Sequence, residues 1–137
     1  MPGERPGVVK LLRWAGSMGR SLPIQVLFDG VTEGAVAPRT AGASFLIPPG
    51  KSYAISVEMD GYYSAPVRVF ARSLHLIELN ICPPTSAMGR MVSERESYFS
   101  LELAGENGIS IVDMIALLRH TSSYNGQVTE ISKHFVD

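Results

Sequence analysis

A strict alternation of apolar and polar residues over 52–59, with the sequence SYAISVEM, most constrains how this chain can fold. Its apolar members are Tyr53, Ile55, Val57 and Met59. A period of two with one apolar face is typical of a half-buried strand in an antiparallel sheet. Pro48-Pro49-Gly50 before the run and Asp60-Gly61 after it favour turns, because proline fixes φ and glycine adopts conformations that other residues avoid. The segment therefore predicts a strand between two turns.

Similar runs recur roughly every ten residues between residues 22 and 82, with turn residues between them. The predicted strands lie in residues 23–30, 44–47, 52–59, 66–71 and 74–81, with a short edge strand and a loop in 31–43. Short strands at this spacing are typical of a sandwich. We therefore expect a mainly β fold, a small antiparallel β-sandwich of the immunoglobulin-like kind, over residues 22–82.

The segment before this sandwich, residues 1–21, has a different pattern. Its apolar residues fall near helical spacing and are Val8, Leu11, Leu12 and Ala15. Lys10 and Arg13 lie off that stripe, so the segment predicts a short amphipathic helix or a docking arm. The same two charges interrupt the apolar stretch that a signal peptide would need. We expect no signal peptide in this chain.

The segments after the sandwich are predicted to be a linker, 83–97, and a tail, 98–137. The tail starts with a possible strand over 98–103. Ser110 then begins a capping box, because its hydroxyl can accept the backbone N–H near Asp113. Residues 111–118 carry a broad apolar helix face, and 127–135 can form a second short helix. We therefore expect a helical C-terminal tail.

Composition limits the function classes. The chain has 137 residues, which suits one domain or a small domain with an appendage. Its formal charge of -1 gives no reason to expect nucleic acid as a partner. No apolar run approaches the ~18 residues of a membrane span. The single cysteine, Cys82, excludes an intrachain disulfide.

The middle of the chain resembles the carboxypeptidase regulatory-like (transthyretin-like) domains over about residues 22–82. The matching residues are Pro49, Gly50, Tyr53, Ile55, Val57, Gly61, Tyr62, Val67 and Val69. The resemblance implies a β-sandwich that serves secreted and surface proteins as a spacer or binding module. It implies no chemistry in this domain itself.

The tail looks like one degenerate repeat of a dockerin, the module that binds cohesins. The matching residues are Asn107, Gly108, Ile109, Asp113, Leu117, Leu118 and Arg119. The spacing from Gly108 to Asp113 is short, and Leu103 stands where the first calcium carboxylate is expected. A calcium loop needs several oxygen ligands at fixed positions. We therefore predict a plain capped helix with no metal site and no cofactor.

Catalytic patterns are not found in the sequence. The three histidines are His75, His120 and His134, and no two have metal-ligand spacing. There is no nucleophile elbow, P-loop or dinucleotide fingerprint. We therefore expect a protein that is not an enzyme.

The function predicted from these patterns is a non-enzymatic protein–protein assembly module of an extracellular or cell-surface complex. Its partner would be a cohesin-like receptor or copies of itself. One alternative is a structural or decoration subunit of a virion or similar particle. A second is a carbohydrate-binding sandwich, in which Trp14, Tyr62 and Tyr63 offer stacking faces.

An apolar patch beside an arginine is the usual composition of an interface centre. The candidate partner-binding residues are accordingly Val112, Leu117, Arg119 and His120.

Overall fold

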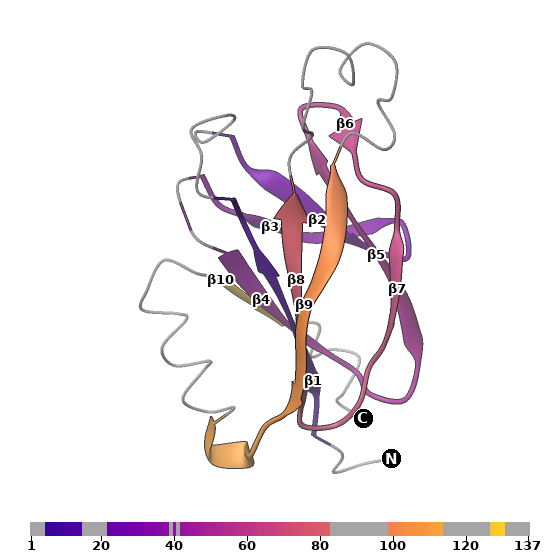
Figure 1. The fold of residues 1–137 in the computed structure, drawn as a ribbon, viewed down its shortest axis with the longest axis vertical. Helices are drawn as coiled ribbons and strands as arrows, with labels where there is room; N and C mark the ends of the chain where they lie inside the picture. Colours follow the sequence, from indigo (N-terminus) through magenta and orange to yellow (C-terminus); the bar gives the residue numbers. More distant parts are fainter. Residues whose placement is uncertain are drawn as a thin grey trace.

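The computed structural model describes residues 5–14, 22–38, 40, 42–82 and 99–113, and the backbone of 127–130. Within these residues the chain forms two sheets that pack face to face as a sandwich (Figure 1). The first sheet, sheet A, has the order β10 (Gln127–Glu130), β4 (Gly42–Ile47), β1 (Gly7–Leu12), β8 (His75–Cys82), β9 (Ser100–Gly108). The second, sheet B, has the order β3 (Val31–Val36), β2 (Ile24–Phe28), β5 (Ser52–Met59), with β6 (Tyr62–Tyr63) and β7 (Val67–Phe70) both paired with β5. The predicted mainly β sandwich is confirmed.

The core lies between the two sheets and follows the alternation in β5. Tyr53, Ile55, Val57 and Met59 are all buried, whereas the residues between them are partly exposed. They meet inward-facing residues of the other sheet, such as Phe45 and Leu79. The predicted inner face of this strand is confirmed.

The two Asp-Gly turns also form as predicted. Asp29 and Gly30 have φ values of 54° and 82°, and Asp60 and Gly61 have φ values of 54° and 83°. Asp29 is fixed by two hydrogen bonds with Ala54. Its backbone N–H donates to the Ala54 carbonyl over 2.7 Å, and its Oδ1 accepts the Ala54 N–H over 2.9 Å. This side chain therefore locks the β2–β3 hairpin onto β5.

The predicted N-terminal helix is wrong, because Gly7–Leu12 forms β1, an inner strand of the first sheet. β1 pairs antiparallel with β4 and parallel with β8. Val9 and Leu11 face the core, while Val8 joins Leu46 in a second cluster on the outer face of the sheet. Apolar residues on both faces remove the alternation that marks a half-buried strand.

The antiparallel sandwich also contains two parallel strand pairs, and the second helix predicted for the tail is wrong at its start. The β1–β8 and β10–β4 pairs are parallel. Residues 127–130 form β10, so the helix expected over 127–135 does not start there. The open edge of β4 offers backbone partners to this segment, and β-branched residues such as Val128 and Thr129 favour strands.

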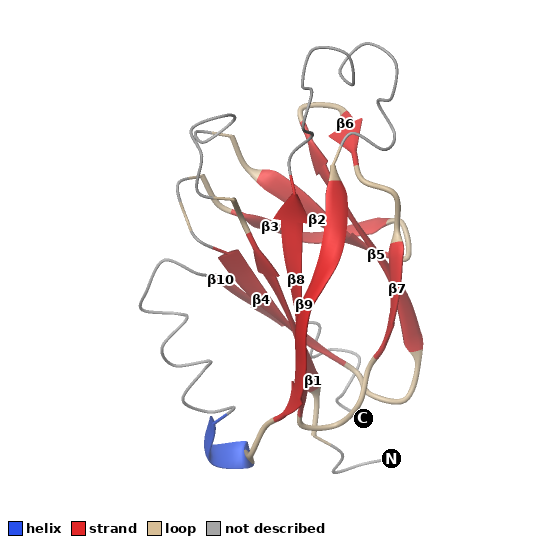
Figure 2. Cartoon of the chain, viewed as in Figure 1, coloured by secondary structure: helices blue, strands red, loops and turns tan. Residues whose placement is uncertain are grey.

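The strand expected near 98–103 is confirmed as the longer β9, which pairs antiparallel with β8. Figure 2 shows helical residues after it, at 111–113, where the described part of this segment ends. The Ser110 hydroxyl accepts the Asp113 N–H over 3.0 Å, as the capping box predicts. The predicted linker, 83–97, lies outside the described residues. In the part of the chain that is described, no helix is long and apolar enough to cross a membrane.

Candidate functional site

The structure places one of the predicted partner-binding residues. Val112 lies in the helical turn at 111–113 and is 73% exposed. Leu117, Arg119 and His120 lie outside the described residues, so the predicted patch stays a prediction. Asn107 and Gly108, from the dockerin-like motif, belong to β9 and pair with β8.

A different candidate site lies at one side of the sandwich, where β7 and β9 end their two sheets. A groove of about 170 Å³ separates these strands. At one end of the groove the sheets touch, because Ser64 and Phe99 form a parallel bridge and the Phe99 N–H donates to the Tyr63 carbonyl over 3.2 Å. Beyond this bridge β7 and β9 separate (Figure 1). We call this opening the side groove.

The side groove is apolar at its floor and on both walls. Its floor is Ile77 and Leu79 of β8, both buried. Val67 and Val69 of β7 line one wall, and the β9 wall includes Leu103. Leu103 pairs with Leu79 and therefore faces inward, yet it is 58% exposed. An inward-facing leucine is this exposed because sheet B ends at β7, whose residues lie across the groove from it rather than packed against it.

Charged groups surround the side groove. Glu106 pairs with Ile77, and its Oε1 lies 3.7 Å from His75 Nε2. Arg68 is exposed on β7, beside Phe70, which is 47% exposed. The site therefore joins an apolar strip to charges of both signs, and this combination is common at the edge of an interface.

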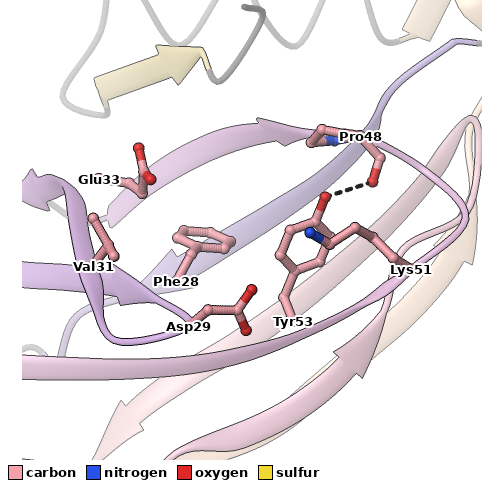
Figure 3. A pocket seen from close by; sticks show the side chains of 7 residues that line it. All are labelled: Phe28, Asp29, Val31, Glu33, Pro48, Lys51 and Tyr53. Atoms are coloured by element: carbon pink, nitrogen blue, oxygen red, sulfur yellow. Dashed lines mark hydrogen bonds between the residues drawn. The ribbon is translucent and has the colours of Figure 1, made fainter. Parts of the chain in front are cut away.

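A second hollow, of about 400 Å³, lies beside the β2–β3 and β4–β5 turns, and we call it the end pocket (Figure 3). It is lined by Phe28, Asp29, Val31, Glu33, Pro48, Lys51 and Tyr53. Its Tyr53 hydroxyl donates to the Pro48 carbonyl over 2.9 Å, and the Lys51 ammonium lies 4.9 Å from the centre of the Tyr53 ring. Burial, with the Asp29 carboxylate adding to it, raises the pKa of Tyr53 to about 12.

Two side chains of this end pocket, Tyr53 and Asp29, make hydrogen bonds that hold the fold. Tyr53 stays neutral at ordinary pH and holds the turn before β5 through Pro48. Asp29 already accepts the Ala54 N–H. Among the described side chains, no group of three or more His, Cys, Asp or Glu could hold a metal ion.

The other residues singled out in the sequence take part in packing. Trp14 stacks on Phe99 with ring centres 5.7 Å apart, and Tyr62 packs against the core. Tyr63 is exposed. Burial, together with the Glu102 carboxylate, raises the pKa of the partly buried Cys82 thiol. A raised pKa keeps this thiol protonated, and the thiolate is the reactive form.

Comparison of the chain with protein-family models, curated proteins and solved structures found no match. The resemblances to carboxypeptidase regulatory-like domains and to dockerins therefore remain predictions from the residues quoted above.

Proposed function

We propose that the chain is a non-enzymatic assembly module that docks onto another protein through the side groove. The observation that supports this proposal is the exposure of Leu103, an inward-facing residue on an edge strand. Edge strands present unpaired backbone groups, and proteins commonly cover such edges or use them for pairing. Adding a strand to a sheet edge is a recurring mode of recognition, in which neighbouring pockets take alternate side chains.

The setting we propose is an extracellular or cell-surface complex, with a cohesin-like receptor or copies of this chain as the partner. A structural or decoration subunit of a virion or similar particle would use the same open side. The surface around Val112, Leu117, Arg119 and His120 is a second proposed contact. The carbohydrate-binding alternative is less well supported, because Trp14 and Tyr62 are engaged in packing.

The experiment compares Leu103→Asp with Val31→Asp in cells that make the protein. Val31 is a matched control, because it is 60% exposed and lies on β3, the edge strand of sheet B away from the groove. We expect the Leu103 variant to lose co-purifying proteins that the Val31 variant retains. Both variants should melt near the wild-type temperature, since exposed substitutions usually change stability by about 0.5 kcal/mol or less. Equal co-purification by both variants would reject the side groove as the docking surface.

A further inference from the structure

We propose that the partner in the side groove is a second copy of this chain, related by a two-fold axis along the strands. In this dimer β9 of each copy pairs with β7 of the other, so that each first sheet continues into the second sheet of its neighbour. The inference rests on the proposed function and names its partner. Among the described residues the site is incomplete in one copy, because the groove has two open edges there and one strand cannot cover both.

The charges of the two edges select this pairing. β9, with the sequence SLELAGENG, carries Glu102 and Glu106 and no basic residue. β7, with the sequence VRVF, carries Arg68 and no acidic residue, and Arg72 follows it. Pairing β9 with β9 would bring two acidic strands together. Pairing β7 with β7 would bring two strands with arginines together. Like charges opposite each other in a sheet are destabilising. The mixed pairing of β9 with β7 brings opposite charges together.

The faces of the strands match in the same arrangement. Arg68 pairs with Ala54 and lies on the outer face of its sheet. Glu102 pairs with Asn80 and also lies on an outer face. When sheet A of one copy continues into sheet B of the other, these two side chains share one surface. Leu103 then shares the inner surface with Val67 and Val69 of the second copy, and the exposed leucine becomes covered.

The bridge at the end of the groove fixes how β7 and β9 are aligned along their length. Ser64 and Phe99 are paired in parallel, so β7 and β9 leave this point in the same direction. Glu58 pairs with Tyr63 and Ala54 with Arg68, so the five residue steps from Tyr63 to Arg68 span only four positions along β5. Arg68 therefore lies three positions beyond Ser64, and Glu102 lies three residues beyond Phe99. A two-fold axis along the strands keeps this alignment in both copies, so Arg68 of one copy lies near Glu102 of the other.

The test is a charge exchange, read as the dimerisation constant of the full chain by sedimentation equilibrium. We expect wild-type protein to dimerise, and Arg68→Glu or Glu102→Arg alone to weaken the dimer about tenfold or more. The double variant Arg68→Glu/Glu102→Arg should recover most of that loss, because it restores opposite charges. Lys51→Glu makes the same charge change at the end pocket and should leave the constant unchanged.

Two results would overturn the proposal: a wild-type chain that stays monomeric, or a dimer in which the double variant is as weak as the single variants. Either result leaves the proposed function open to its own experiment. If Leu103→Asp still loses its co-purifying proteins, the groove binds a different protein. In that case only the proposal that the partner is a second copy is wrong. If Leu103→Asp changes neither dimerisation nor co-purification, both proposals fail.

Discussion

Ser64 fills a gap in the edge of sheet B. β6 and β7 lie on the same edge of β5, and Ser64 follows the end of β6. Its backbone N–H donates to the Val57 carbonyl over 2.9 Å, and its hydroxyl accepts the Val57 N–H over 3.0 Å. This hydroxyl therefore satisfies a buried donor that has no backbone partner in the ladder.

Ser64→Ala removes that acceptor and leaves the Val57 N–H buried without a partner. We expect a loss of about 1–3 kcal/mol in the free energy of unfolding, measured by urea denaturation. Ser56→Ala is the matched control, because Ser56 lies on the outer face of the same strand and is partly exposed. A loss no larger than that of the control would show that water replaces the hydroxyl.

Tyr53 should make stability depend on alkaline pH. Its pKa is raised from 10.0 to about 12 in the folded protein. A raised pKa means that its contribution to stability is complete below pH 10 and is lost as pH rises toward 12. The free energy of unfolding should therefore fall more steeply over this range in wild type than in Tyr53→Phe. Urea titrations at several pH values would measure both slopes, and parallel slopes would contradict the raised pKa.

At the scale of single elements, β5 and its turns could be predicted from local sequence. The alternation from Tyr53 to Met59 reports its buried face, because one side of β5 packs on the core. The Asp-Gly pairs at 29–30 and 60–61 mark turns, because their backbone requires positive φ. These signals are contained within a few residues, and so the sequence alone reveals them.

Local sequence does not predict β1, because the strands beside it determine its conformation. Its residues are apolar on both faces, and such a run does not distinguish a buried strand from a helix. Its place is fixed by partners far along the chain, β4 and β8. Gly42 permits the close approach, because a Cβ there would overlap the Leu11 carbonyl. Such long-range contacts leave no local pattern.

Leu11→Ala tests the position of β1. Leu11 is fully buried in the core, so we expect a loss of about 2–5 kcal/mol in the free energy of unfolding. Lys10→Ala, one residue away on a partly exposed position, should change it by about 0.5 kcal/mol or less. Equal small effects in chemical denaturation would mean that β1 is a loosely attached arm.

At the scale of the whole molecule, the two sides of the sandwich differ. β10 approaches β3 on one side, whereas β7 and β9 enclose the side groove on the other. The sequence predicted the two layers, because alternation reports burial. It could not predict the groove, because Leu103 alternates with Glu102 like any core residue. Whether an opposite sheet reaches Leu103 depends on the length and place of β7, which the residues around Leu103 do not encode.

The inner position of β1 has a consequence for the order of folding. β1 is made before all the other strands, yet Val8 pairs with Leu76 of β8. During synthesis this edge of β1 has no partner until most of the sandwich has been translated. Contacts between distant parts of a chain slow folding. Apolar strands that are still unpaired during folding are prone to aggregate. We therefore expect the first sheet to be completed late, after the β2–β5 pairing of the second.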